Sequence, residues 1–262
     1  MTEANLKTPG EIRADAWRVL GTNGQYLRYV AAYLLLTLVM MAISIPLMMV
    51  LGVGIGVSGI ASYFAPGGQP EIGLFLDPEV MVPLLVSVLA FALLAIYPLG
   101  FGMWGQAAMA IATMRRGLTA GHGLSGWGHG WKMGWIVAVK ITYLHLWALL
   151  LVVPGLVKFF SYAMTEFVAV DHPDWNAQQC ITESRRLMDG HKLRYFLMLL
   201  GFIGWLLLAM AASALPLIGN FAQWLLMPYL ETAKAAFYEN LLDSSESKSD
   251  FHHSLEFCEF GH

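Results

Sequence analysis

Two long stretches of the sequence contain no Asp, Glu, Lys or Arg. The first runs from Tyr29 to Pro70 and the second from Val80 to Met114. A helix needs about 20 consecutive, predominantly apolar residues to cross the hydrocarbon core of a bilayer. A surface helix of a soluble protein would instead carry a polar face along its length, and neither stretch does. The sequence therefore predicts a helical protein that spans a membrane.

The composition supports this prediction and excludes other classes of protein. Hydrophobic residues make up 57% of the chain and charged residues 13%, whereas about 25% of an ordinary soluble domain is charged. The net charge of −3 does not favour a nucleic-acid partner. The two cysteines, Cys180 and Cys258, are too few for a disulfide framework. The N-terminus is polar and then amphipathic, so we expect no cleavable signal peptide.

The order of polar and apolar segments predicts an all-α fold, a polytopic transmembrane helical bundle of about six spans. A cytoplasmic N-terminus (1–28) with one interfacial helix, a transmembrane domain (29–242) and a disordered cytoplasmic tail (243–262) are expected. Each pair of spans is expected to follow a short amphipathic helix at the membrane interface. The expected interfacial helices are 8–20, 121–133 and 174–190, and the expected spans are 29–53, a second from 80, 135–153, 156–170, 193–215 and 221–242.

Prolines and glycines are expected to interrupt several spans. The segment 98–102, with one proline and two glycines, is predicted to break the second span, which would otherwise overshoot the bilayer at 1.5 Å per residue. Pro154 and Gly155 are predicted to turn the chain between the third and fourth spans. Pro228 lies inside the sixth span. We expect structural roles for these three residues.

Ionisable residues inside the predicted spans are the first candidates for a functional site. A charge at mid-bilayer costs about 2.5–3.5 kcal/mol on the insertion scale, and such residues usually face the interior of the protein. Lys158 and Glu166, with Tyr162 one turn from each, form a candidate ligand site or polar path, in which Glu166 is expected to find a donor such as Lys158 or Tyr162. For three other ionisable candidates, snorkelling to the cytoplasmic surface or a pair one turn apart is the preferred explanation. These are Lys140, Glu231 and Lys234.

The expected helix 174–190 begins at Asp174, ends at Gly190 and is predicted to lie flat on the cytoplasmic surface. Arg185 is expected to make a fixed bond inside the protein. Three other basic residues are expected at the level of lipid phosphates, which attract such side chains by about 1 kcal/mol each. These are Arg186, Lys192 and Arg194.

No motif of a catalytic centre or a metal site is found. His122 and His129 lie in a glycine-rich stretch without nearby carboxylates or thiols, so neither a metal nor a cofactor is expected. Trp127, Trp131 and Trp135 recur at helical spacing. An aromatic belt at the membrane interface explains these tryptophans better than an aromatic cage for a ligand.

A series of residues in the second half of the chain carries a family resemblance. These are Pro154-Gly155, Lys158, Ser161-Tyr162, Ser184-Arg185, Met188, Gly190, Lys192, Phe196, Gly204-Trp205, Pro228-Tyr229 and Phe237-Tyr238. Through them, residues 154–238 resemble the bacterial membrane family catalogued as domain-of-unknown-function family 975. The N-terminal half resembles the family more loosely, through Arg13, Ala16 and Leu20. The resemblance implies a multi-helix membrane protein and supplies no reaction.

The preferred prediction is a non-enzymatic membrane protein that binds a membrane lipid, a small amphiphile, another membrane protein or a second copy of itself. One alternative is a transporter or transporter subunit with a polar path near Lys158 and Glu166. Another is a membrane-embedded enzyme, for which no nucleophile and base are found. Lys and Arg are absent from 54–79 and 216–220. The positive-inside rule therefore predicts both termini in the cytoplasm, and the family resemblance implies a multi-pass protein of the bacterial inner membrane.

Overall fold

The computed structural model describes residues 6–63, 78–115, 117, 119–150, 152–212 and 219–259, and among them there are helices and no strand. The prediction of an all-α fold is confirmed. The helices are α1 (Pro9–Gly21), η1 (Thr22–Gly24), α2 (Gln25–Tyr63), α3 (Pro78–Arg115), α4 (Ala120–Leu124), η3 (Ser125–Gly128), α5 (Gly130–Leu150), α6 (Val152–Ser161), α7 (Thr165–Asp171), α8 (Ala177–Leu187), α9 (Lys192–Leu200), α10 (Ile203–Ala212) and α11 (Gly219–Glu259).

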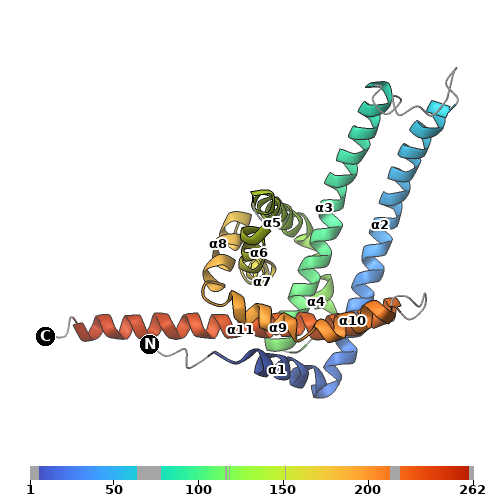
Figure 1. The fold of residues 1–262 in the computed structure, drawn as a ribbon. Coiled ribbons are helices and arrows are strands. Elements are labelled where there is room, and N and C mark those ends of the chain that lie inside the picture. The colour runs from blue at the N-terminus through green and yellow to red at the C-terminus, as the bar shows by residue number, and fades with distance from the viewer. Residues whose placement is uncertain are drawn as a thin grey trace.

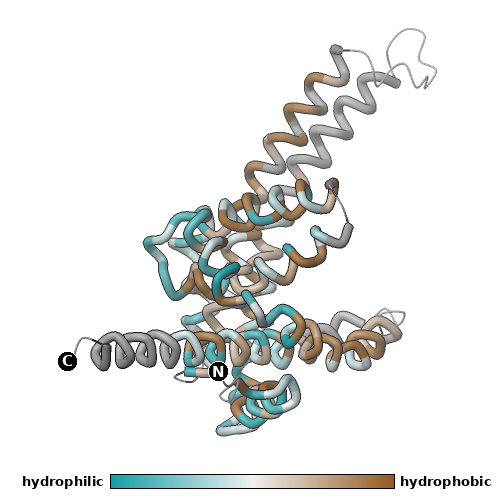
Figure 2. Tube along the Cα trace, turned by 60° about the vertical axis from the view of Figure 1, so that its left-hand side comes forward, coloured by the Kyte–Doolittle hydropathy of each residue, from teal (hydrophilic) through white to brown (hydrophobic). Residues whose placement is uncertain are grey.

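The helices α2 and α3 lie side by side and project from the rest of the molecule (Figure 1). The helices α9, α10 and α11 run across the base of this pair, with α1 beside them, and α5 to α8 gather next to α3. Apolar residues are dense along α3 and around α10, whereas polar residues gather around α8 and α1 (Figure 2). The helices therefore do not form one bundle of parallel spans.

Within the described part of the chain, two helices are long and apolar enough to cross a membrane. The qualifying stretches are Pro9–Pro46, which ends within α2, and Val88–Arg115 in α3. The pair α9 and α10, bent by 42° at its break, is a third candidate. The expected number of about six spans is not confirmed. The expected span 156–170 is replaced by α6 and α7, which have 10 and 7 residues and are too short to cross a bilayer alone.

Two expected interruptions of the helices do not occur. The segment 98–102 lies within α3, which is continuous from Pro78 to Arg115. Pro154 and Gly155 do not form the turn after α5, because α6 already begins at Val152 and includes both residues. A proline in the first turn of a helix is tolerated, since its missing N–H has no partner there in any case.

Glycines allow α3 and α5 to cross at close range. A Cβ atom added to Gly100 would lie 2.0 Å from the carbonyl oxygen of Gly130, and one added to Gly134 would lie 2.2 Å from the carbonyl oxygen of Ile96. These obstacles are backbone atoms, which a rotamer change cannot move. The small residues therefore set the distance between the two helices, as they do at close helix crossings in membranes.

Of the first two segments expected to be interfacial helices, one forms a single helix and the other is divided. The segment 8–20 corresponds to α1, where the Thr8 hydroxyl accepts from the Glu11 N–H and the Glu11 carboxylate accepts from the Thr8 N–H. The segment 121–133 is instead made of α4, η3 and the first turn of α5, which begins at Gly130. The five glycines within residues 121–133 explain why no single helix forms there.

The third expected interfacial helix, 174–190, is shorter than predicted. Helix α8 begins after Asn176 rather than at Asp174, because Asn176 and Gln179 form a reciprocal cap. The Gln179 N–H donates to Asn176 Oδ1 at 2.9 Å, and the Asn176 N–H donates to Gln179 Oε1 at 2.8 Å. Gly190 follows the helix with φ of 76°, the left-handed conformation that glycine favours after a helix end.

The disordered tail expected from residue 243 is helical as far as Glu259, because α11 continues through it. No glycine or proline occurs between residues 229 and 260, so the sequence contains no strong helix stop. The predicted span 221–242 is therefore only the first part of a helix of 41 residues.

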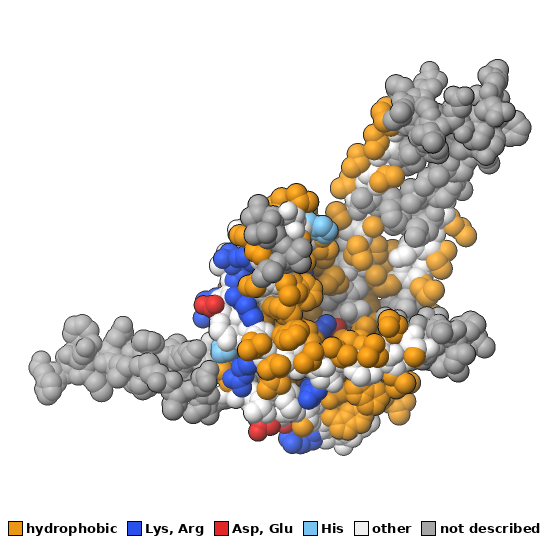
Figure 3. All heavy atoms as spheres, in the orientation of Figure 1, with side chains coloured by type: hydrophobic (Ala, Val, Ile, Leu, Met, Phe, Trp, Pro, Cys, Tyr) orange, Lys and Arg blue, Asp and Glu red, His pale blue; other side chains and the backbone are white. Residues whose placement is uncertain are grey.

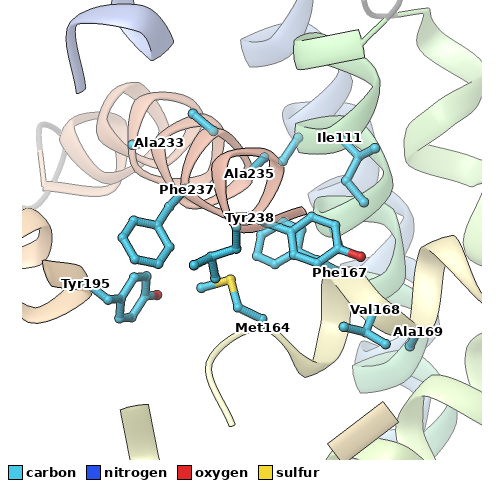
Figure 4. Packing of buried hydrophobic residues seen from close by; sticks show 14 of the residues in the cluster. Ile111, Met164, Phe167, Val168, Ala169, Tyr195, Ala233, Ala235, Phe237 and Tyr238 are labelled. Atoms are coloured by element: carbon cyan, nitrogen blue, oxygen red, sulfur yellow. The ribbon is translucent and has the colours of Figure 1, made fainter. Parts of the chain in front are cut away.

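The largest core lies where α11 meets α3, α7 and α9 (Figure 4). The ring of Tyr238 in α11 stacks on Phe167 in α7, with ring centroids 5.6 Å apart. Phe237 meets Tyr195 in α9 edge to face, with centroids 5.1 Å apart. Such aromatic pairs contribute about 0.5–1.5 kcal/mol beyond their buried area. They hold α7 and α9 against α11 and thereby fix the charged side chains near this core.

Candidate functional site

An apolar cavity of about 570 Å³ lies between α1, α2, α10 and α11. Its volume falls in the range of about 300–1,000 Å³ that is typical of small-molecule sites. Four lining residues are aromatic: Trp17 of α1, Tyr26 of α2, Trp205 of α10 and Tyr229 of α11. The other lining residues are Leu or Ala of α10 and α11. The cavity is therefore built by segments from both ends of the chain.

The two tyrosines of the cavity have their hydroxyl groups bound to backbone. Tyr26 Oη donates to the carbonyl of Leu225 at 2.7 Å, and Tyr229 Oη donates to the carbonyl of Arg13 at 3.4 Å. Trp17 meets the ring of Tyr229 edge to face at 5.3 Å between centroids. Because the hydroxyls are satisfied by protein groups, the tyrosines offer mainly their rings to an occupant.

Glu166, one of the predicted site residues, is buried in α7 with 9% of its surface exposed. Its carboxylate accepts a hydrogen bond from the Lys140 ammonium of α5. The expected donors were Lys158 and Tyr162, and neither is bonded to Glu166 in the described part of the chain. Lys140 therefore does not snorkel to the surface as predicted, since its ammonium is used inside the protein.

Glu231 and Lys234 form a second ion pair, within α11, at 2.8 Å. The sequence predicted this pair, one turn apart, as an explanation for two ionisable residues inside an expected span. Glu231, Lys234 and Glu166 all lie within electrostatic range of the buried Tyr195 hydroxyl. The structure thus brings α5, α7, α9 and α11 together around two closed ion pairs of zero net charge, and none of these residues lines the cavity.

Lys158 and Tyr162 lie apart from this charged group. The Lys158 ammonium is 4.6 Å from the centre of the Trp147 ring in α5, a cation–π contact that joins α6 to α5. Tyr162 is buried in the break between α6 and α7, with 4% of its surface exposed. The predicted group of Lys158, Tyr162 and Glu166 is therefore not a single site.

Arg185, expected to make a fixed internal bond, is exposed on α8 and has no hydrogen bond or ion pair with any described residue. Arg186 forms a two-pronged ion pair with Glu183 on its own helix, at 2.8 and 2.6 Å, and remains solvent-exposed. Ser184, next to Arg185, makes the internal bonds instead. Its hydroxyl donates to the Ser161 carbonyl at 2.9 Å and accepts from the Met164 N–H at 3.2 Å.

Arg194, expected at the level of lipid phosphates, is bound to the N-terminal segment. Its Nη2 donates to the carbonyls of Leu6 and Lys7 at 2.7 and 2.6 Å. Lys192 is only loosely paired, with its ammonium 3.9 Å from the Asp189 carboxylate. The fixed role predicted for Arg185 therefore belongs to Arg194.

One polar cluster was missed by the sequence analysis. Arg115, at the end of α3, donates through both Nη atoms to the Asp171 carboxylate at 2.8 Å and through Nε to Glu239 at 2.7 Å. Tyr238 Oη also donates to Asp171, at 2.9 Å. The only signal in the sequence is that Arg115 ends a long charge-free stretch. Its partners lie 56 and 124 positions away, beyond any local pattern.

Residues 129–245 match the family model described as Protein of unknown function (DUF975). This part of the chain belongs to that family. No curated protein and no solved structure matches the chain. The match confirms the resemblance to this family that was inferred from residues between Pro154 and Tyr238. The DUF975 region includes both ion pairs, Ser184 and the α10 and α11 walls of the cavity, whereas Trp17 and Tyr26 lie outside it.

Proposed function

We propose that this protein is an integral membrane protein that holds the acyl chain of an amphiphile in the cavity between α1, α2, α10 and α11. One observation supports this function above the others: the cavity has an apolar and aromatic wall, and its tyrosine hydroxyls are bound to backbone carbonyls. A polar solute would gain few hydrogen bonds from such a wall. An acyl chain would gain about 0.8 kcal/mol for each CH₂ group it buries.

The proposed placement has the α2–α3 pair crossing the bilayer and α9 to α11 entering it from one side. Helix α10 is apolar all round, and hydrophobic side chains gather over α9 and α10 on the face shown in Figure 3. Exposed apolar surface of this kind suits contact with lipid. Helix α1 would lie at headgroup depth, as amphipathic helices do. The exposed residues Trp127, Trp131 and Trp135 would form the predicted aromatic belt.

The proposed orientation places both termini in the cytoplasm of a bacterial cell, because the segment 54–79, which includes the connection between the two crossing helices, contains no Lys or Arg. A cysteine at Gly68, which lies outside the described residues, tests it in a background without Cys180 and Cys258. An impermeant maleimide should label this cysteine in intact cells. Labelling only after the cytoplasmic side has been opened would reverse the orientation.

The cavity favours binding over the transport alternative. The ionisable residues proposed for a polar path, Lys158 and Glu166, are engaged elsewhere, with Trp147 and with Lys140. Neither of them lines the cavity.

Quenching of tryptophan fluorescence by a neutral brominated alkyl maltoside tests the proposed function, since Trp17 and Trp205 line the cavity. The variant that carries both Trp17→Phe and Trp205→Phe lacks the two reporters at the cavity. The cavity signal is the difference between the quenching of the wild-type protein and the quenching of this variant. Ala209→Phe adds a ring to the lining and should weaken this signal severalfold. Ala211→Phe adds the same ring to α10 away from the lining and should leave it unchanged. Equal signals in the two variants would refute binding in the cavity.

A further inference from the structure

Arg13 of α1 places an unpaired positive charge close to the cavity. Its guanidinium is partly buried, and no carboxylate forms an ion pair with it in the described ranges of the chain. Trp17, which lines the cavity, follows Arg13 by four residues on the same helix and so lies one turn away. The other basic residue of α1, Arg18, is exposed and paired with Asp15 at 2.8 Å.

The Arg13 guanidinium lies against Gly201, in the break between α9 and α10. A Cβ atom added to Gly201 would lie 1.3 Å from Arg13 Nη1, so the guanidinium occupies the space that a side chain at position 201 would fill. Trp205 lies four residues beyond Gly201 and lines the cavity. The Arg13 carbonyl accepts from Tyr229, another lining residue. Arg13 is therefore linked to the cavity through α1, the break before α10, and α11.

We propose that Arg13 binds the phosphate of an anionic membrane phospholipid whose acyl chain occupies the cavity. This inference rests on the proposed function and names the class of amphiphile. A guanidinium matches the oxygens of a phosphate with two parallel N–H donors. An apolar cavity with an unpaired cation near it complements an apolar chain that ends in an anion. The proposed depth of α1, at the headgroups, makes a bilayer phospholipid the nearest source of that anion.

Brominated phospholipids in nanodiscs test this assignment through the cavity signal of Trp17 and Trp205. Brominated phosphatidylglycerol should bind about tenfold more tightly than brominated phosphatidylcholine, the factor expected for one charged hydrogen-bonded contact. Arg13→Gln should abolish this preference, whereas Arg18→Gln, which removes an equal charge from the same helix, should keep it.

A second pair of variants leaves the charge of the protein unchanged. Gly201→Ala would push the Arg13 guanidinium out of its place and should also abolish the preference. Its φ of −67° is one that alanine adopts freely, so the change acts through space and not through backbone strain. Gly204→Ala is the control, because nothing lies within 4 Å of a Cβ atom at that position. Thermal unfolding of all four variants would confirm that they remain folded.

The possible outcomes separate this inference from the proposed function. Absence of a cavity signal with every brominated chain would refute both. A signal of equal strength for the two phospholipids, or a preference that survives Arg13→Gln, would overturn the role of Arg13 and leave chain binding intact. A brominated fatty acid that displaces phosphatidylglycerol at equal concentration would assign the site to a free carboxylate and overturn the phospholipid assignment.

Discussion

The Lys140 ammonium of α5 donates a hydrogen bond to the Glu166 carboxylate of α7, 26 positions further along the chain. Both side chains are mostly buried, with 19% and 12% of their surface exposed. A charge in such a place is costly unless an opposite charge compensates it. The pair therefore makes the position of α7 dependent on α5. A loss of either charge should lower the free energy of unfolding of the protein.

Lys140→Met should lower the free energy of unfolding by about 3 kcal/mol, because it leaves the Glu166 carboxylate buried without a partner. Thermal or denaturant unfolding in detergent measures this loss. The double variant with Glu166→Met should recover most of it, since no charge then remains. Lys158→Met, which removes only a cation–π contact, should cost at most about 1 kcal/mol. Equal losses for the two lysines would contradict the assigned importance of the pair.

Gly100→Ala should destabilise the protein by about 2 kcal/mol or more, because its Cβ would meet the Gly130 carbonyl oxygen and force α3 and α5 apart. The matched control is Gly128→Ala, whose Cβ would have no neighbour within 4 Å. Melting temperatures of the two variants in the same detergent would decide the matter. A Gly100→Ala protein as stable as the control would mean that the two helices are free to separate.

The parts of this structure that could be predicted from sequence depend on local patterns. The Thr8 cap of α1 and the Glu231–Lys234 pair join residues three positions apart, so the chain itself brings them together. The charge-free stretches predicted long apolar helices because a missing charge is visible residue by residue. The burial of Glu166 followed from the same reasoning, since a lone carboxylate in an apolar segment is stabilised by turning inward.

The parts that could not be predicted depend on contacts between distant segments. The sequence shows which face of a helix is apolar, but not which helix covers that face. Lys140 was therefore assigned to the surface and Glu166 was given the wrong donors. The expected number of spans was not confirmed for a related reason. Apolar length shows that a segment can enter a bilayer, but not that α9 to α11 lie across the base of α2 and α3 (Figure 1).

Cys180 should resist thiol reagents in the folded protein. Its side chain is fully buried, and burial raises the pKa of its thiol, so less of the reactive thiolate is present at any pH below that pKa. In a Cys258→Ser background, Cys180 should react with a maleimide at least about tenfold more slowly than a cysteine introduced by Thr182→Cys on the exposed side of α8. Raising the pH from about 7 to 9 should accelerate labelling at position 182 first. Similar rates in the native state would show that α8 is not packed as described.

Arg194→Met should release the N-terminal segment from α9. The variant loses the donor to the Leu6 and Lys7 carbonyls, and hydrogen bonds from charged groups contribute about 1.5–3 kcal/mol. Lys7 then keeps its ion pair with Asp15, but its backbone is no longer held, so trypsin should cleave the native protein after Lys7 severalfold faster, which mass spectrometry of the products would show. Arg186→Met removes an exposed pair within one helix and should change stability by less than about 0.5 kcal/mol without affecting that cleavage. If both variants kept the wild-type cleavage rate, Arg194 would not hold the N-terminal segment. Arg194 would then be available to bind lipid phosphates, as the sequence analysis predicted.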